Sequence, residues 1–289
     1  MSEPTAQAPH RRSPGRDLPA AILVAVVLLG LMAVSLLWAH WAFVLLVAVL
    51  LTFGVHEVAQ ALRQVEMRPA LWPLAVGTIL IVSSSYLVSK FHLVDLNPST
   101  ITLSLIGLTA LVCLIWRMPG GAHGYVRDAA ASMFILGYIP VLGSFVGLLV
   151  AGDNGAGRVL TYILIVIAGD TGGYLFGVLF GKHKMAPTIS PKKTWEGLAG
   201  SFALGIATAI VLAIWVLGVA WWVGLILGVV VVIAGVCGDL IESLIKRDVG
   251  LKDMGSVLPG HGGVMDRLDS LLAACPVAWL TMFLLIPGG

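Results

Sequence analysis

Residues 221–239 read WWVGLILGVVVVIAGVCGD, an unbroken apolar run that ends at the carboxylate of Asp239. The run has the length of a transmembrane helix, because an α-helix needs roughly 20 apolar residues to cross a bilayer. Further apolar runs occupy residues 18–38, 41–56, 70–89, 99–116, 129–151, 159–180, 197–217 and 271–287. Together these runs predict an all-α, polytopic integral membrane protein of about nine transmembrane helices.

The composition excludes the water-soluble classes of protein. Of the 289 residues, 58% are hydrophobic and 11% are charged, and the net charge is +2. Soluble domains are roughly 45–50% apolar and about 25% charged. So few charges cannot cover a soluble body of this size, and so small a net charge is unlike that of a nucleic-acid-binding protein. We exclude a cytosolic enzyme, a disordered chain and a nucleic-acid partner, and we expect a lipid bilayer around the chain.

The lysines and arginines predict the orientation. If the N-terminus is cytoplasmic, every Lys and Arg except Lys90 and Arg158 falls on the cytoplasmic side, as the positive-inside tendency requires. We therefore expect the protein in the cell (inner, cytoplasmic) membrane with an external C-terminus. Residues 1–18 are predicted to be a disordered cytoplasmic tail, residues 19–155 to hold about five spans and residues 156–289 about four.

Two predicted cytoplasmic loops, residues 181–196 and 239–269, are far more polar than the rest of the chain. Asp239, Glu242, Ser243 and Lys246 have the spacing i, i+3, i+4, i+7, which places them on one face of a helix. A charged, solvated helix end is one interpretation of this pattern. A carboxylate directly after an apolar run is costly unless it is paired or metal-bound, which favours a functional site.

The segment that follows combines a glycine-rich turn with two acids. Residues 259–263 read PGHGG, and such a turn lets the backbone approach a phosphate closely. Asp266 and Asp269 then lie at the start of the last span. Oxygen ligands on two adjacent helix ends suit Mg²⁺, which is commonly held by one or two carboxylates together with substrate phosphates.

The first polar loop is basic and contains two prolines. It is either a juxtamembrane loop that binds anionic lipid headgroups or a cradle for a polyanion, in which lysines neutralise charge while Ser190 and Thr194 donate hydrogen bonds. Asp170, an acid among glycines in an apolar helix, is a functional candidate. Glu57, near the end of the second span, is either a packing hydrogen-bond partner or a wall of the site.

These segments resemble a known family. Residues 243–269, SLIKRDVGLKDMGSVLPGHGGVMDRLD, resemble the signature of phosphatidate cytidylyltransferases, the CDP-diacylglycerol synthases. Residues 190–197, SPKKTWEG, resemble the second motif of that family, and Asp170 matches the acid upstream of it. The resemblance covers about residues 165–270, so residues 156–289 are predicted to be the catalytic membrane domain. Residues 1–155 share only the presence of several membrane helices.

The resemblance implies transfer of a cytidylyl group from CTP to phosphatidate, with release of pyrophosphate. It also implies Mg²⁺ as cofactor and a homodimer, and it leaves open whether a second cation takes part. The implied catalytic residues are Asp239, Asp266, Lys246, Lys193, Ser190 and Asp170, with Asp239 and Asp266 as the metal ligands. The implied substrate-binding residues are Lys192, Thr194, Glu196, Glu242, Ser243, Arg247, Lys252, Asp253, His261, Gly262, Gly263, Arg267 and Asp269.

Two other classes of function remain open at this point. A CTP-dependent lipid kinase of the polyprenol or phytol type would use a related C-terminal pattern and would release CDP instead of pyrophosphate. A membrane transporter would place polar sites near the bilayer midplane and would carry inverted repeats. The polar residues of this sequence instead gather at one side, and no repeat is evident.

Overall fold

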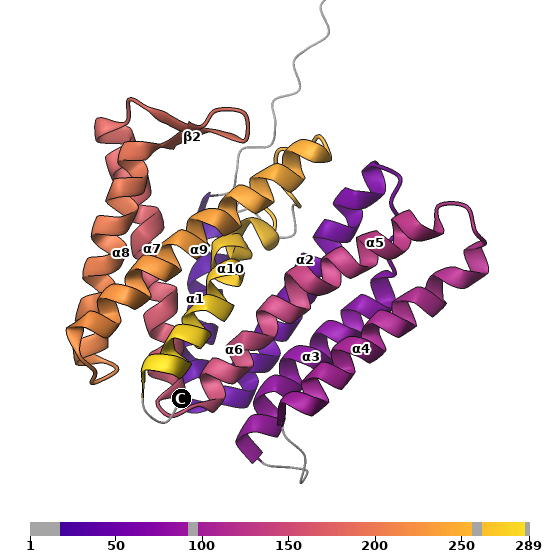
Figure 1. Ribbon diagram of the computed structural model, residues 1–289, viewed down its shortest axis with the longest axis horizontal. Coiled ribbons are helices and arrows are strands. Elements are labelled where there is room, and N and C mark those ends of the chain that lie inside the picture. The colour runs from indigo at the N-terminus through magenta and orange to yellow at the C-terminus, as the bar shows by residue number, and fades with distance from the viewer. Residues whose placement is uncertain (1–17, 92–97, 256–261, 287–289) are drawn as a thin grey trace, which may run out of the picture.

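The computed structural model describes residues 18–91, 98–255 and 262–286 (Figure 1). The predicted all-α membrane fold is confirmed, because eight helical segments within these ranges are long and apolar enough to cross a membrane. With α1 they match the nine predicted spans in order. The helices are α1 (Leu18–Trp38), α2 (His40–Gln64), α3 (Leu71–Phe91), α4 (Pro98–Arg117), α5 (Tyr125–Leu136), α6 (Leu142–Ala151), α7 (Gly155–Phe180), α8 (Trp195–Trp215), α9 (Trp221–Asp248) and α10 (Met265–Leu285).

The predicted fifth span is two helices joined without a break. A π-helical segment, η2 (Gly137–Val141), links α5 to α6 and contains Pro140. Proline has no N–H to donate and disturbs a regular α-helical turn, so a wider turn at this point is expected. A short 3-10 turn, η1 (Met118–Gly120), follows α4.

The boundaries of the two predicted polar loops are partly wrong. The α9 helix continues to Asp248, and α10 already begins at Met265, so the second loop is shorter than residues 239–269. Hydropathy falls at Asp239, but apolar residues keep a helical spacing beyond it, and an amphipathic helix therefore continues past the apolar run. The first loop contains an antiparallel hairpin, β1 (Lys184–Ala186) and β2 (Ser190–Thr194). The predicted tail (except Leu18) and His261 lie outside the described residues.

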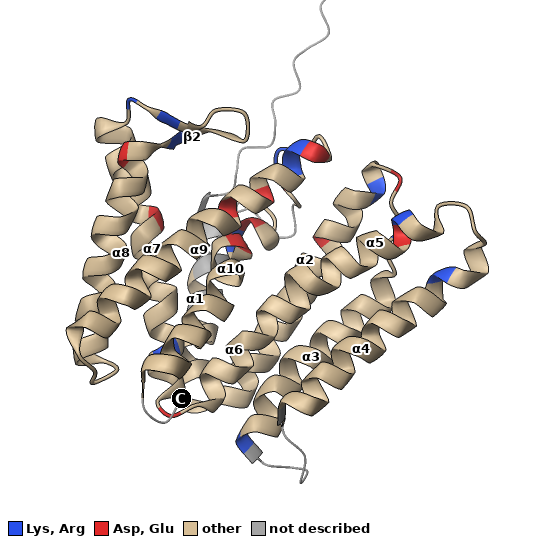
Figure 2. Ribbon diagram, in the orientation of Figure 1, with Lys and Arg blue, Asp and Glu red and all other residues tan. Residues whose placement is uncertain are grey.

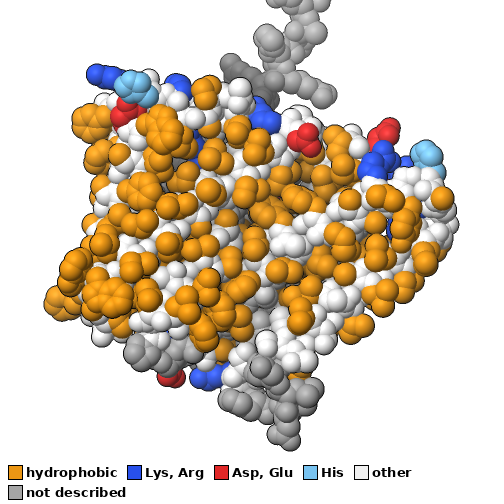
Figure 3. Space-filling model, viewed as in Figure 1, with side chains coloured by type: hydrophobic (Ala, Val, Ile, Leu, Met, Phe, Trp, Pro, Cys, Tyr) orange, Lys and Arg blue, Asp and Glu red, His pale blue; other side chains and the backbone are white. Residues whose placement is uncertain are grey.

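The hairpin and most charged side chains share one end of the bundle (Figures 1 and 2). The helices run alternately up and down, so that the described lysines and arginines lie in or beside the loops at the hairpin end, except Lys90 and Arg158. Hydrophobic side chains cover the flank between the two ends (Figure 3). This distribution is typical of a membrane protein, and the cytoplasmic position of the hairpin end stays a prediction.

Small residues bring α7 and α8 into close contact. A Cβ atom on either Gly172 or Gly200 would overlap the carbonyl group of the other residue. Helices in a membrane approach closely where both present small side chains. The contact places the start of α8, and with it the hairpin, beside Asp170 of α7.

A glycine also allows the α9 and α10 helices to cross closely. A Cβ atom on Gly238 would lie 2.5 Å from the carbonyl oxygen of Asp269 and 2.8 Å from Cβ of Ala273. The crossing therefore depends on the missing side chain. It brings the acidic end of α9 against the acidic start of α10.

Candidate active site

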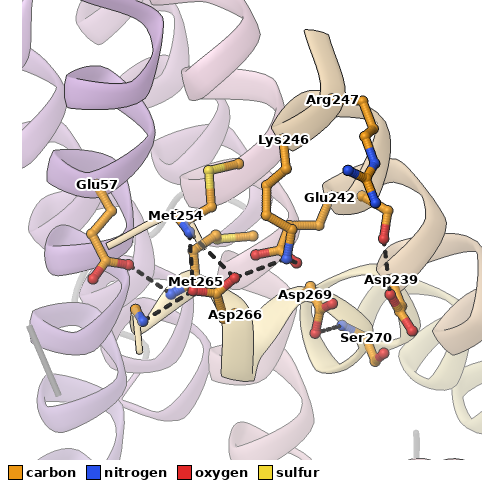
Figure 4. Close-up of polar contacts among 12 residues, drawn as sticks. Glu57, Asp239, Glu242, Lys246, Arg247, Met254, Met265, Asp266, Asp269 and Ser270 are labelled. Carbon is orange, nitrogen blue, oxygen red and sulfur yellow. Dashed lines mark hydrogen bonds and ion pairs between the residues drawn. The ribbon is translucent and has the colours of Figure 1, made fainter. Parts of the chain in front are cut away.

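Lys246 joins the two helix ends. Its Nζ lies 2.6 Å from Oε2 of Glu242, one turn earlier on α9, and 2.8 Å from Oδ1 of Asp266 on α10 (Figure 4). The three groups are largely buried, with side-chain exposures of 18%, 1% and 12%. In surroundings that exclude water, such a charge-paired contact is strong and well oriented. The predicted common face of Glu242 and Lys246 is therefore present.

Asp266 also organises the backbone of the preceding loop. Its Oδ2 accepts hydrogen bonds from the backbone N–H of Gly263 (3.0 Å) and of Met254 (3.1 Å). Gly262, at φ +86°, adopts a left-handed conformation that favours glycine. The path of the backbone thus accounts for the presence of glycine at both positions. Contact of Gly262 and Gly263 with a substrate stays a prediction.

A second lysine–carboxylate pair lies on the hairpin side of α9. Nζ of Lys193, on β2, is 2.8 Å from Oδ2 of Asp239, and the hydroxyl of Ser243 is 3.3 Å from Oδ1 of the same aspartate. A cavity of about 310 Å³ opens beside this pair. Among its lining residues are Asp170, Ser190, Lys192, Lys193, Thr194 and Asp239. The structure therefore brings together three separate parts of the sequence that were predicted to belong to one site.

Several carboxylates are concentrated between these elements. Asp269 interacts electrostatically with Asp239 and Asp170, and Asp239 also acts on Asp170. Oε1 of Glu242 is buried and has no hydrogen-bond partner among the described residues. Carboxylates thus outnumber the two paired lysines. Such a donor set fits a hard divalent cation, which oxygen ligands bind preferentially.

The carboxylates of the described residues are not arranged as a complete set of metal ligands. Among the residues that the structure describes, no three His, Cys, Asp or Glu side chains converge closely enough to hold a metal ion. The two predicted ligands, Asp239 and Asp266, are instead paired with different lysines. The predicted Mg²⁺ clamp remains a prediction.

Several predicted substrate-binding residues hold the hairpin in place. Thr194 is the N-cap of α8, where its Oγ1 accepts a hydrogen bond from the N–H of Gly197. Glu196 accepts hydrogen bonds from the N–H of Lys182 (3.1 Å), and its carboxylate lies 2.6 Å from Nδ1 of His183. Nε of Arg247 donates to the carbonyl of Ile189 (3.3 Å) and ties α9 to the hairpin turn. Lys252, Asp253 and Arg267 are exposed, and their contact with a substrate stays a prediction.

Glu57 has a definite place that the sequence left open. Its carboxylate, on α2, accepts hydrogen bonds from the backbone N–H of Val264 (2.9 Å) and of Met265 (2.8 Å) (Figure 4). Of the two alternatives for Glu57, the structure therefore agrees with a hydrogen-bond partner in the packing of the helices. Its partners, however, are the residues directly before Asp266. The available signal was an isolated acid in an apolar helix.

The fold and the site define a polytopic membrane protein in which lysines and carboxylates gather around a cavity at one end of a helix bundle. The family model described as "Cytidylyltransferase family" matches residues 19–285, and the chain belongs to this family. The predicted resemblance is confirmed.

Curated relatives agree with this assignment. The phosphatidate cytidylyltransferase of Mycobacterium bovis is 42% identical over 256 residues, which cover 84% of this chain and 81% of the relative. That of Mycobacterium leprae is 39% identical over 274 residues, 89% of this chain and 85% of the relative. That of Staphylococcus saprophyticus is 40% identical over 151 residues, 52% of this chain and 57% of the relative. The shorter match corresponds to about half of the chain.

Proposed function

We propose that this protein transfers the cytidylyl group of CTP to phosphatidate and forms CDP-diacylglycerol and pyrophosphate. The observation that carries the proposal is the family match over residues 19–285. Within that match, Ser190, Lys192 and Lys193 of the second motif line a cavity together with Asp170 and Asp239. Ser243, the first residue of the signature segment, hydrogen-bonds to Asp239 beside that cavity. The relatives that share most of their length with this chain carry the same activity in their names.

The chemistry fits side chains that neutralise charge. An oxygen of the phosphatidate phosphate forms a bond to the α-phosphorus of CTP, and the bond from that phosphorus to the β-phosphate oxygen breaks. Pyrophosphate leaves with the electron pair. A phosphate monoester is already anionic, so no side chain has to remove a proton from it. The barrier is electrostatic, and positioning with charge neutralisation lowers it. We assign this role to Lys193, which pairs with Asp239, and to Lys246, which pairs with Asp266, together with Lys192 at the cavity.

The surplus of carboxylates supports a divalent cation as part of the site. We assign Asp239 and Asp266 as its ligands, with Asp269 beside them. Bound there, Mg²⁺ would neutralise phosphate charge and align the triphosphate. A homodimer remains an expectation from the family resemblance, and a second cation stays an open alternative. The hairpin end is proposed to face the cytoplasm, where CTP is available.

The products distinguish the proposed reaction from its rivals. Purified protein is incubated with CTP labelled at the α-phosphate, mixed micelles of phosphatidate and Mg²⁺. We expect labelled CDP-diacylglycerol and one pyrophosphate per lipid, both dependent on phosphatidate. Labelled CDP formed with an isoprenoid alcohol, and no labelled lipid, would instead establish a lipid kinase. Substrate movement across proteoliposomes with no chemical conversion would establish a transporter.

A further inference from the structure

Glu57 links the N-terminal half of the chain to the segment directly before Asp266. It lies in α2, and its hydrogen-bond partners Val264 and Met265 are 207 and 208 residues later in the sequence. The side chain is 1% exposed. A buried carboxylate is costly unless its oxygens are satisfied. Here both oxygens are, each by one backbone N–H.

The α10 helix lacks a cap of its own. The first N–H groups of a helix have no partner within the helix and are commonly satisfied by a Ser, Thr, Asp or Asn side chain at the N-cap. The N-cap residue of α10 is Val264, which has no such side chain. Glu57 provides the acceptor from another helix. Its negative charge is also favourable at a helix N-terminus.

The same short segment is held from its other side by Asp266. Gly263 donates its N–H to Asp266, while Val264 and Met265 donate theirs to Glu57. A Cβ atom on Gly263 would lie 2.8 Å from both carboxylates, and one on Gly255 would overlap that of Glu57. The backbone therefore fits tightly between two acids, so that displacement of Glu57 moves the turn that carries Asp266.

We propose that Glu57 is a positioning residue for cytidylyl transfer. It fixes the first turn of α10 and thereby the direction in which Asp266 faces Lys246, without itself touching a substrate. The inference rests on the role proposed above for Asp266. It also gives the N-terminal helices a part in the reaction, since α2 supplies one of the two carboxylates that shape the catalytic turn.

The test uses Glu57→Gln in the full-length protein, in nanodiscs. Glutamine keeps the size of the side chain, but it offers one acceptor oxygen and turns an N–H donor toward the other backbone N–H. We expect faster hydrogen–deuterium exchange in peptides that cover residues 262–268, and unchanged exchange in α3 and α4. We also expect the Mg²⁺ concentration at half-maximal rate to rise, or kcat to fall, by about 10–100-fold, the usual effect of losing a group that orients a metal ligand. KM for CTP should change less.

Asp128→Asn is the matched control. Asp128 is also a buried carboxylate of the N-terminal half, and it accepts the N–H of Arg68 (2.8 Å) and pairs with Arg117. Among the described residues, its side chain contacts Arg68, Arg117 and Arg127, all outside residues 254–269. We expect this variant to lose thermal stability, while the folded protein keeps its exchange pattern in residues 262–268 and its Mg²⁺ requirement.

A double-mutant cycle tests the contact directly. Gly255→Ala should be damaging in the native chain, because the added methyl group meets Glu57, and clearly less damaging in a Glu57→Ala background. Additive effects, or native exchange at residues 262–268 in Glu57→Gln, would refute the contact. Altered exchange with native kcat and Mg²⁺ dependence would refute the positioning role. Because exchange needs no turnover, a failure of the proposed reaction would be seen separately.

Discussion

Asp239 and Asp266 are both paired with lysines, but their surroundings differ. Asp239 contacts the side chains of Lys193 and Ser243. Asp266 contacts Lys246 and also accepts backbone N–H groups that shape the loop before α10. A change at Asp239 therefore alters the charge of the cavity, whereas a change at Asp266 alters both charge and backbone.

Substitution of each aspartate by asparagine should separate these effects. Asp239→Asn and Asp266→Asn should each lower kcat by at least about 100-fold, the scale of losing one charge-stabilising group. Asp266→Asn should in addition lower thermal stability, because hydrogen bonds to a charged group contribute about 1.5–3 kcal/mol. Turnover, Mg²⁺ titration and thermal unfolding check this. Lys184→Ala, on the outer part of the hairpin, is the control that should retain activity. Near-native turnover of both aspartate variants would contradict the metal assignment.

At this scale the sequence predicted local side-chain geometry better than contacts between distant segments. The spacing of Glu242 and Lys246 predicted their common face, because helix geometry is local. The pairing of Lys193 with Asp239 depends on how α7, α8 and α9 pack, and spacing alone does not contain it. The same holds for Glu57, whose partners lie far away in the sequence.

Among the helices, close crossings decide how the acids meet. The α9 and α10 helices approach at Gly238, where no side chain separates them, directly beside Asp239. The prediction of helical spans succeeded because apolar length is a property of each segment. The helical spacing of Asp239, Glu242 and Lys246 predicted a helix beyond the apolar run, although its end at Asp248 was not fixed by hydropathy. The hairpin was not predicted, since the basic loop has no apolar alternation.

Gly238→Ala tests the crossing. The added methyl group would force the helices apart, and overpacking typically costs about 1–3 kcal/mol. We expect a lower unfolding temperature and a fall in kcat, as Asp239 and Asp269 lose their relative positions. The control is Gly107→Ala in α4, where a Cβ atom meets nothing within 4 Å. It should leave activity unchanged and leave stability equal or slightly raised. Equal behaviour of the two variants would refute the importance of the crossing.

For the whole molecule, the separation of charge between the two ends predicts its orientation. The hairpin end carries the described lysines and arginines apart from Lys90 and Arg158 (Figure 2). The side of the membrane on which the cavity opens determines which pool of nucleotide reaches it.

Single cysteines in a chain whose three native cysteines are replaced test that orientation. Thr188 is exposed in the hairpin turn, and Ala220 is exposed in the loop between α8 and α9 at the opposite end. In intact cells, Ala220→Cys should react with an impermeant thiol reagent, and Thr188→Cys should react only after the membrane is opened. The reverse pattern would place the cavity outside the cytoplasm.

The two lysine–carboxylate pairs have a consequence for the order in which ligands bind. On the proposed mechanism, a phosphate that binds Lys193 or Lys246 breaks the ion pair of that lysine and frees the paired aspartate to bind a cation. A cation that binds the aspartate likewise frees the paired lysine to bind a phosphate. Each ligand therefore removes the competitor of the other. Such coupling is reciprocal by thermodynamic necessity and typically amounts to about 1–3 kcal/mol. Nucleotide and metal should then bind cooperatively, without any movement of the helices that hold them.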